Sequence, residues 1–230
     1  MYRTLLIRGV DLCLATIALL CLSPLLLIVA VILRVTGEGK VLYLQERVGR
    51  QAKPFYIYKF ATMLEGSPNM PGGLLTQRGD PRVLPFGRVL RVTKINEIPQ
   101  LLNIVKGDIS IVGPRPIAFD HFALYPVEYR HVYYNQRPGL TGIGSVFFRN
   151  EEGVMAECGA DPEVFYASVI MPYKAALEDW YYTHRSLRLN VRLLWWTCLV
   201  ILGKSPGVPK TLQLPEPPEQ LRHLALSAIS

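Results

Sequence analysis

The longest hydrophobic stretch of the chain lies near its N-terminus. From Leu12 to Leu33 it has 22 residues without a charge. As a straight helix it would measure about 33 Å, and the apolar part of a bilayer is about 30 Å thick. Ser23 and Pro24 stand at its midpoint, where proline removes a backbone donor and crowds the preceding turn. The pattern therefore predicts a membrane helix that breaks or kinks at Ser23 and Pro24, with the Ser23 hydroxyl satisfying a carbonyl that the kink frees.

The charges beside this stretch bear on its topology. Arg3 and Arg8 precede it, and Arg34, Lys40 and Arg47 follow it. Both flanks thus carry the positive charge that normally stays cytoplasmic. The residues alone leave a spanning helix and a re-entrant helix equally supported. A secretory signal peptide is disfavoured, since the stretch is too long for a signal h-region and no small-x-small cleavage site follows.

The middle of the chain changes to the period-2 pattern of strands. Val41–Val48 and Pro54–Phe60 concentrate β-branched and aromatic residues on either side of a turn-like stretch, which predicts a hairpin. Glu65–Pro81 is rich in glycine and proline and predicts a loop. Helical periodicity resumes near Phe86.

A helix is expected over Ile95–Val105. Its apolar positions follow the helical period, and Asn96 is a residue type that caps helices. Asn96 and Glu97 would then lie at a helix N-terminus, a position that favours anions.

Farther on, Ile109–Val112 predicts a short strand that runs into Gly113–Pro116, and a mixed helical region follows to about Asn135. Arg137–Phe148 returns to turn and strand character. Prolines beyond Gly203 predict an extended tail.

A basic amphipathic helix is expected near the end of the apolar pattern. Arg185, Arg188 and Arg192 recur at spacings of three and four. Two interpretations stay open, a helix at the membrane surface and a helix packed on a soluble core; the apolar stretch near the N-terminus favours the first. The apolar residues between these arginines include Leu187, Leu189, Val191, Leu193, Trp195 and Trp196.

Composition agrees with a membrane-associated protein of about one compact domain. The 230 residues are 50% hydrophobic and 19% charged, with a net charge of +7 and a pI of about 9.3. Basic and apolar character together suit an anionic membrane face. A nucleic-acid partner is not expected, because it would call for a soluble basic stripe without a long apolar segment. The four cysteines have no C-x-x-C spacing, so neither a disulfide framework nor a zinc site is indicated.

Candidate chemistry rests on cations and few carboxylates, since no Walker loop, GxSxG, HExxH or dinucleotide motif occurs. A diphosphate ligand requires cations to offset its charge. Most such side chains in any protein are simply solvated, but Arg115 stands between two prolines that fix its backbone. The cations in or beside Gly- and Pro-punctuated stretches are Lys59, Arg82, Arg88, Arg91, Lys94, Arg115 and Arg137.

Glu97 and Asn96 form the best candidate reactive pair. A carboxylate at a helix start can serve as a nucleophile, a base or a magnesium ligand. The simpler interpretation is a capping Asn with a dipole-favoured Glu in the first turn, and spacing does not decide between the two.

Together these motifs resemble the bacterial sugar transferases, the monotopic phosphoglycosyl transferases that initiate surface polysaccharide and glycoconjugate synthesis. The resemblance runs from about Arg8 to Thr197. The matching residues are Asp11, Ser23-Pro24, Gln45, Arg47, Gly49, Lys59-Phe60, Thr62-Met63, Asp80, Arg82, Gly87-Arg88, Leu90-Arg91, Glu97, Pro99-Gln100-Leu101, Asn103, Lys106-Gly107-Asp108, Ser110, Val112-Gly113-Pro114-Arg115-Pro116, Pro138-Gly139 and Thr141-Gly142.

The resemblance implies an α+β fold: a re-entrant helix-break-helix anchor bent at Ser23 and Pro24, followed by a small, mostly helical cytoplasmic catalytic domain with a β-hairpin and short strands, plus interfacial amphipathic helices. The expected divisions are an anchor at 1–36, a catalytic domain at 37–202 and a tail at 203–230. The expected place is the cytoplasmic face of a bacterial inner membrane, among its lipids.

The same resemblance implies a reaction. A uridine-diphosphate sugar would be the donor, a polyprenyl phosphate the acceptor and Mg²⁺ the cofactor, with later glycosyltransferases of the pathway as partners. Lys59, Arg82, Arg88, Arg115 and Arg137 would bind substrate phosphates. In the family the phosphosugar is held covalently on an aspartate, and the products are a polyprenyl-diphosphate sugar and the nucleoside monophosphate.

This sequence departs from the family at the reactive pair. The usual Asp-Glu reads Asn96-Glu97, and Ala61 replaces the arginine usual after Lys59-Phe60. An amide is a poor nucleophile and a weaker magnesium ligand than a carboxylate. Three accounts remain: Glu97 is the nucleophile and magnesium ligand, the lipid phosphate attacks directly, or the protein is a silent polyprenyl-phosphate-binding scaffold. We favour an enzyme that uses Glu97; the reserve carboxylates are Asp108, Glu151 and Glu152.

Overall fold

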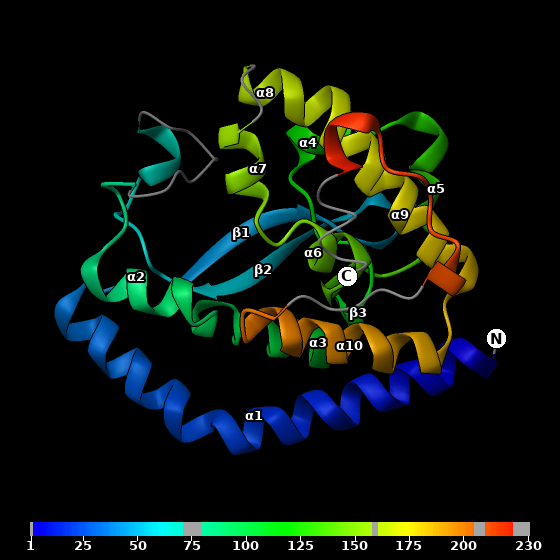
Figure 1. Cartoon of the computed structure of the whole chain (residues 1–230). Helices are drawn as coiled ribbons and strands as arrows, with labels where there is room; N and C mark the ends of the chain where they lie inside the picture. The colour runs from blue at the N-terminus through cyan, green and yellow to red at the C-terminus, as the bar shows by residue number, and fades with distance from the viewer. Residues whose placement is uncertain (1, 71–79, 158–160, 205–209, 223–230) are drawn as a thin grey trace. The chain divides into compact units, whose positions relative to one another are not determined.

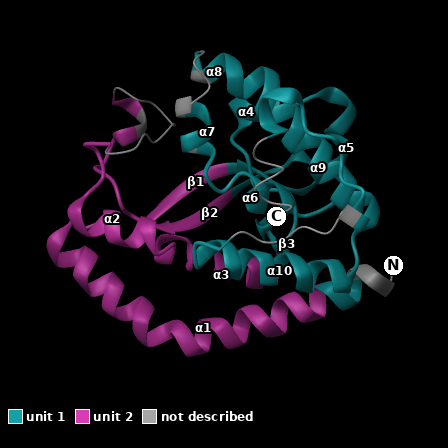
Figure 2. Ribbon diagram, in the orientation of Figure 1, with its two compact units in different colours: residues 1–7, 47–55, 108–230 teal, residues 8–46, 56–107 magenta. Residues whose placement is uncertain are grey.

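The computed structural model describes residues 2–70, 80–157, 161–204 and 210–222. They form two compact units, shown in different colours in Figure 2. Unit 1 comprises Met1–Ile7, Arg47–Phe55 and Asp108–Ser230, and unit 2 comprises Arg8–Glu46 and Tyr56–Gly107. The fold is mixed α+β, mostly helical with two small sheets.

Helix α1 (Tyr2–Thr36) runs through Pro24 without the expected break. Ser23 Oγ donates a hydrogen bond of 2.8 Å to the Leu20 carbonyl, the group that loses its partner because proline has no N–H. This contact confirms the role expected of Ser23. Since the carbonyl is satisfied locally, the helix bends instead of breaking, and Figure 1 shows the bend near the middle of α1.

Most of α1 does not pack inside the protein. In the described part of the chain, Leu5–Thr36 is the one helical stretch long and apolar enough to cross a membrane, with a mean hydropathy of 2.9. Leu20 and Leu27 are 70% and 67% exposed. A core helix would bury such side chains, so their exposure favours contact with lipid.

Unit 2 contains most of the predicted hairpin, which the structure confirms as β1 (Leu42–Val48) and β2 (Pro54–Phe60); Arg47–Phe55 belongs to unit 1. Helix α2 (Pro85–Val92) provides the predicted helical segment near Phe86. The core of the unit joins α1, β2 and α2, and its buried members are Val29, Leu33, Phe60 and Leu90.

The helix expected over Ile95–Val105 begins later than predicted. Ile95–Glu97 forms a 3₁₀ turn, and α3 spans Gln100–Lys106 with Pro99 at its N-cap. Proline has a fixed φ suited to a first helical turn and no N–H to satisfy, which explains the start at this point. Asn96 therefore does not cap a helix. The prediction that Asn96 and Glu97 lie at a helix N-terminus, where an anion would be favoured, is wrong.

Unit 1 contains a second sheet, whose strands β3 (Ser110–Val112) and β4 (Gly139–Thr141) pair in parallel. The strand character expected through Phe148 is wrong beyond Thr141. There the chain turns into α6 (Ile143–Phe147), because burial of Ile143 and Val146 in the core outweighs the β-like composition.

The other elements of unit 1 are helical. The core combines Val48, Tyr125, Tyr133, Met171 and Ala175. In the described part of the tail Leu221 is fully buried, so this part packs on unit 1. The helices are α4 (Phe119–Ala123), α5 (His131–Asn135), α7 (Glu151–Glu157), α8 (Pro162–Phe165), a π-helical turn (Tyr166–Ile170), α9 (Met171–His184) and α10 (Leu187–Ile201); the 3₁₀ turns are Arg50–Ala52, Ser67–Asn69, Val127–Tyr129, Lys210–Leu212 and Glu219–Leu221.

Helix α10 is the predicted basic amphipathic helix, begun by a Ser186 cap that accepts from the Leu189 N–H. Leu189, Leu193 and Trp196 are buried, whereas Trp195 on another face is 62% exposed. The two interpretations of this helix thus apply to different faces of it. One face packs on the core, and on the other face arginine and tryptophan side chains are accessible.

Candidate functional site

In unit 2, β2 and α3 are fastened together by the side chain of Asn103, which is fully buried. Its Oδ1 accepts from the Tyr58 N–H at 3.0 Å, and its Nδ2 donates to the Tyr56 carbonyl at 2.7 Å. Lys59 follows Tyr58 on β2, and Glu97 lies three residues before the start of α3. The amide therefore joins the strand that carries the predicted cation Lys59 to the helix that follows the predicted reactive carboxylate Glu97.

Replacing Asn103 by alanine should destabilise the protein by roughly 1–3 kcal/mol, because two partly buried backbone groups of β2 lose their partners. Thermal unfolding of the purified protein in detergent measures the effect. Leu102→Ala is the matched control, since Leu102 lies on the same helix and is 43% exposed. Equal midpoints for the two variants would contradict the fastening role.

Asn96 is buried in the 3₁₀ turn, at 8% exposure. Its Oδ1 accepts no hydrogen bond within the described ranges. Buried polar atoms normally have a partner, so an acceptor oxygen in this state is unusual. Glu97 beside it is partly exposed. The turn thus presents an amide oxygen and a carboxylate next to each other, both of which are oxygen ligands.

Arg82 is engaged inside unit 2. Its guanidinium is 5% exposed, pairs with Asp80 through an Nη2–Oδ2 distance of 2.6 Å, and donates to the Ser67 carbonyl at 2.8 Å. Hydrogen bonding to Asp80 raises the pKa of Arg82 above its ordinary value. The structure therefore gives Arg82 a role in holding the loop that contains Ser67. That Arg82 binds phosphate stays a prediction.

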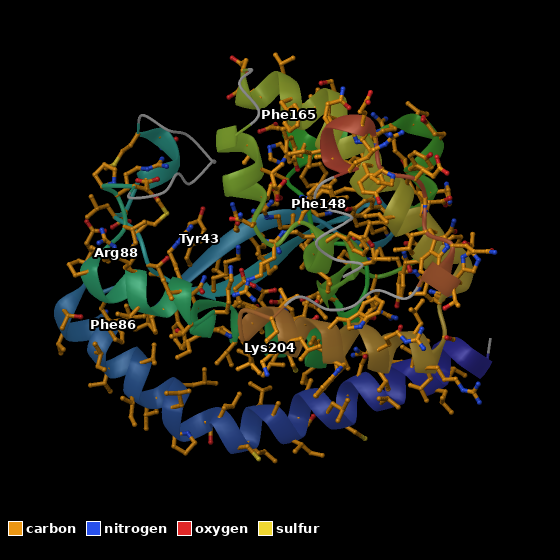
Figure 3. The ribbon with its side chains drawn as sticks, viewed as in Figure 1. Tyr43, Phe86, Arg88, Phe148, Phe165 and Lys204 are labelled. Atoms are coloured by element: carbon orange, nitrogen blue, oxygen red, sulfur yellow. The ribbon has the colours of Figure 1, made fainter. Side chains whose placement is uncertain are left out.

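Arg88 lies on the exposed side of α2. Figure 3 shows Arg88 and Phe86 on opposite sides of the helix, and Phe86 packs against the core of unit 2. Gly87 between them lies against the backbone of Thr62: a Cβ at this position would be 2.2 Å from the Thr62 carbonyl oxygen. This close approach sets the orientation of α2 and, with it, of Arg88.

In unit 1, the loop that carries Arg115 is held along its whole backbone. Pro114 and Pro116 are buried while Arg115 is exposed, as the flanking prolines predict for an aimed side chain. Arg137 lies just before β4 and is partly buried. The bonds that hold the loop are Gly113 N–H to Thr141 O at 2.9 Å, Gly139 N–H to Pro114 O at 2.8 Å, Tyr133 Oη to Arg115 O at 2.8 Å and Val48 N–H to Ile117 O at 2.9 Å.

Sequence analysis missed two charged residues of α9. Lys174 pairs with Glu151 at 2.6 Å, so this reserve carboxylate is engaged, and burial lowers the pKa of Lys174. Glu178 is 4% exposed, and its Oε1 lies so close to Gly144 that a Cβ there would be 2.7 Å away. Lys174 and Glu178 are four residues apart, a spacing that in sequence resembles an ordinary exposed helical pair.

Burial raises the pKa of Glu178 to about 8. The backbone N–H groups of Gly144 and Arg115 and the charge of Lys174 act in the opposite direction and lower this pKa by less. The folded state thus keeps a proton on Glu178 that the unfolded chain releases near pH 4.5, since 4.5 is the ordinary pKa of a glutamate. The stability from this group is fully present below that value and is lost as pH rises through about 8.

We expect the thermal midpoint of the parent protein to fall between pH 5 and pH 9 more steeply than that of Glu178→Gln, which has no proton to lose. Titrating both proteins in one buffer series isolates this group from other carboxylates. If the midpoints of the two proteins fall in parallel as pH rises, the raised pKa of Glu178 is contradicted.

The described residues offer magnesium a small ligand set. Among the described residues there is no group of three or more His, Cys, Asp or Glu side chains placed to hold a metal ion. Mg²⁺ commonly uses one or two protein carboxylates together with substrate phosphates. Glu97 and Asn96 Oδ1, the buried acceptor described above, fit this mode.

The fold and these residues define a membrane-associated protein that presents cations on short, firmly held segments. The chain belongs to the bacterial sugar transferase family, whose model matches residues 2–204.

Relatives with assigned names agree with this membership. The chain is 40% identical over 144 residues to a UDP-N-acetylgalactosamine-undecaprenyl-phosphate N-acetylgalactosaminephosphotransferase of Aeromonas hydrophila, covering 60% of this chain and 33% of that protein. It is 41% identical to a UDP-glucose:undecaprenyl-phosphate glucose-1-phosphate transferase of Caulobacter vibrioides, covering 60% of this chain and 52% of that protein.

A third relative matches over more of its length. The exopolysaccharide production protein ExoY of Rhizobium meliloti is 33% identical, covering 73% of this chain and 82% of that protein. The chain thus spans a third to a half of the two relatives named for a transfer activity, and most of ExoY.

Proposed function

We propose that this chain transfers a sugar phosphate from a uridine-diphosphate sugar to a polyprenyl phosphate such as undecaprenyl phosphate. The products are a polyprenyl-diphosphate sugar and UMP, and the reaction is the first membrane step of polysaccharide or glycoconjugate assembly. The observation that carries the proposal is the fastening of the Lys59 strand to the helix that follows Glu97, through buried Asn103. Family membership supplies the reaction class.

Glu97 is the proposed nucleophile. One of its carboxylate oxygens attacks the phosphorus that bears the sugar, the bond from that phosphorus to the bridging oxygen breaks, and UMP leaves with the electron pair. An oxygen of the polyprenyl phosphate then attacks the same phosphorus, and Glu97 leaves as a carboxylate. Two displacements at one phosphorus conserve all atoms and regenerate the protein.

The cations bind phosphate oxygens in this scheme. Lys59, Arg88, Arg115 and Arg137 are the proposed phosphate ligands; Arg82 contributes through its hold on the loop and as a predicted phosphate ligand. Fixed positive groups stabilise the charge that develops on transfer, and they do so most strongly where water is excluded. Mg²⁺, held by Glu97 with Asn96 Oδ1, would offset diphosphate charge when bound.

The membrane placement follows from α1 and α10. Leu20 and Leu27 of α1 are exposed and apolar, and both flanks of the stretch carry arginine. We propose that α1 enters and leaves the cytoplasmic leaflet of the inner membrane, bent at Ser23 and Pro24, and that the exposed Trp195 and Arg192 of α10 contact a membrane surface. Later glycosyltransferases of the pathway would take the lipid product there.

The sugar itself is the open element of the proposal, since the two named transferases are named for different sugars. The loop over Glu65–Pro81 and the segment Phe148–Asp161 are the proposed places where it is selected, although 71–79 and 158–160 lie outside the described residues.

A donor screen tests the function. Purified protein is incubated with Mg²⁺, undecaprenyl phosphate and a panel of UDP-sugars, and UMP release is measured. Release from at least one donor, dependent on the lipid, is expected. If no donor releases UMP and Asn96→Asp acquires activity, the chain is a silent lipid-binding scaffold and the proposal fails.

A further inference from the structure

The backbone carbonyl of Arg115 accepts a hydrogen bond from a buried tyrosine of α5. The Tyr133 hydroxyl donates to it at 2.8 Å, and Tyr133 is 1% exposed. We propose that Tyr133 is a positioning residue: its hydroxyl holds the peptide plane that follows Arg115 and thereby aims the guanidinium at a substrate phosphate. This inference rests on the proposed function, because it takes Arg115 as a phosphate ligand. It adds a residue to which neither the sequence motifs nor the relatives' names assign a role.

The direction in which a side chain leaves the backbone depends on the two peptide planes that meet at its Cα. The plane before Arg115 is held by the Gly139 N–H, which donates to the Pro114 carbonyl at 2.8 Å. The plane after it is held by Tyr133. Proline fixes φ at Pro114 and Pro116, and a residue that precedes proline is biased to extended conformations. The Arg115 backbone therefore has little freedom to turn while both hydrogen bonds are present.

The ring of Tyr133 is itself fixed by the core of unit 1. It packs edge-on against Phe122, with ring centroids 5.6 Å apart, and edge-on against Tyr125 at 5.2 Å. This is a geometry that aromatic pairs prefer. Val48 and Met171 belong to the same core. A hydroxyl on a ring packed in this way has a defined position, so it can define the position of the carbonyl that it contacts.

The hydroxyl is the part of Tyr133 that packing does not require. A phenylalanine would make the same ring contacts, and burying a hydroxyl has a cost unless the group is hydrogen-bonded. Burial raises the pKa of Tyr133 well above its ordinary value, so the hydroxyl keeps its proton and acts as a donor. A backbone carbonyl can only accept. The bond to the Arg115 carbonyl is thus what the hydroxyl adds to the ring.

The consequence for function is geometric. Arg115 is exposed, so its backbone sets where the guanidinium can reach. Displacing a catalytic contact by about 1 Å can reduce turnover on the order of 100-fold. Tyr133→Phe removes one oxygen and keeps the ring, and we expect it to lower kcat/KM by about 10- to 100-fold.

Tyr125→Phe is the matched control, since it removes a hydroxyl from the same aromatic cluster. Tyr125 is 4% exposed, and its hydroxyl has no hydrogen-bond partner in the described part of the chain. This variant should keep the kcat/KM of the parent. The assay is UMP release by the full-length protein in detergent, with Mg²⁺, undecaprenyl phosphate and a UDP-sugar that the parent accepts. Equal losses in the two variants would overturn the proposal, as would an unchanged kcat/KM in Tyr133→Phe.

A double-mutant cycle separates positioning from general damage. If Tyr133 acts through Arg115, Tyr133→Phe should cost no further turnover in an Arg115→Ala background. Additive losses would overturn the proposal. Thermal midpoints accompany each variant, and a lower midpoint of Tyr133→Phe without a loss of kcat/KM would give the hydroxyl a structural role alone and overturn it as well.

Amide hydrogen exchange gives a readout that needs no activity. Two amides donate to carbonyls on either side of Arg115. The Gly139 N–H donates to the Pro114 carbonyl at 2.8 Å, and the Val48 N–H donates to the Ile117 carbonyl at 2.9 Å. Exchange at these two amides therefore reports how firmly the loop is held.

Tyr133→Phe should speed exchange at both amides, and Tyr125→Phe should not. Unchanged exchange in Tyr133→Phe overturns the proposal. If the parent protein turns over no donor, the proposed function fails, and exchange still decides whether Tyr133 holds the loop.

Discussion

Glu97→Gln is expected to reduce UMP release by at least about 1,000-fold, because an amide can neither attack phosphorus nor offer magnesium a carboxylate. The amide has nearly the same shape, and Glu97 is partly exposed, so the fold should be unaffected. The thermal midpoint of the variant should therefore equal that of the parent. Radiolabelled UDP-sugar and undecaprenyl phosphate give the rate.

Glu46→Gln is the matched control for this loss, since Glu46 is an exposed carboxylate of the same unit. A second measurement addresses the covalent step: with donor but no lipid acceptor, the parent protein should gain the mass of a sugar phosphate on the peptide that contains Glu97. Full turnover by Glu97→Gln would remove Glu97 as nucleophile. A mass gain on another peptide would identify the residue that replaces it.

Gly87→Ala is expected to have a large effect on stability. The new Cβ would lie 2.2 Å from the Thr62 carbonyl oxygen and 2.9 Å from its carbon, and backbone atoms do not move aside as a flexible side chain does. Helix α2 must therefore shift, and it takes Leu90 of the unit 2 core with it. Overpacking of this kind costs about 1–3 kcal/mol and sometimes more.

The measurement is the thermal midpoint in detergent, together with UMP release. Gly9→Ala serves as the control, because alanine in an open helical position should be neutral or slightly stabilising. Activity should fall with stability, since α2 carries Arg88. An unchanged midpoint for Gly87→Ala would show that α2 does not approach Thr62 so closely.

Local patterns predicted a large part of the fold. The apolar stretch became α1, the alternating segments became the hairpin, and the serine beside Pro24 makes the contact expected of it. Each of these features depends on residues close together in the chain, where periodicity and the chemistry of proline act directly.

The start of α3 was predicted less well. An asparagine before an apolar helical pattern is the usual sign of a cap, yet Pro99 begins the helix and leaves Asn96 in a separate turn. Pro99, the competing start signal, lies three residues after Asn96. The sequence does not show which of these two residues begins the helix. Burial of Asn96 is a property of the folded unit.

The sequence by itself determined the apolar anchor, the hairpin, the family and the set of candidate cations. The tertiary structure alone decided which of these groups are held and by what: Arg82 by Asp80, β2 by Asn103, and the Arg115 backbone by Tyr133. Except for Arg82 and Asp80, these partners are far apart in the chain. No local pattern specifies such pairs, because burial and hydrogen-bond partnership arise only when distant segments pack together.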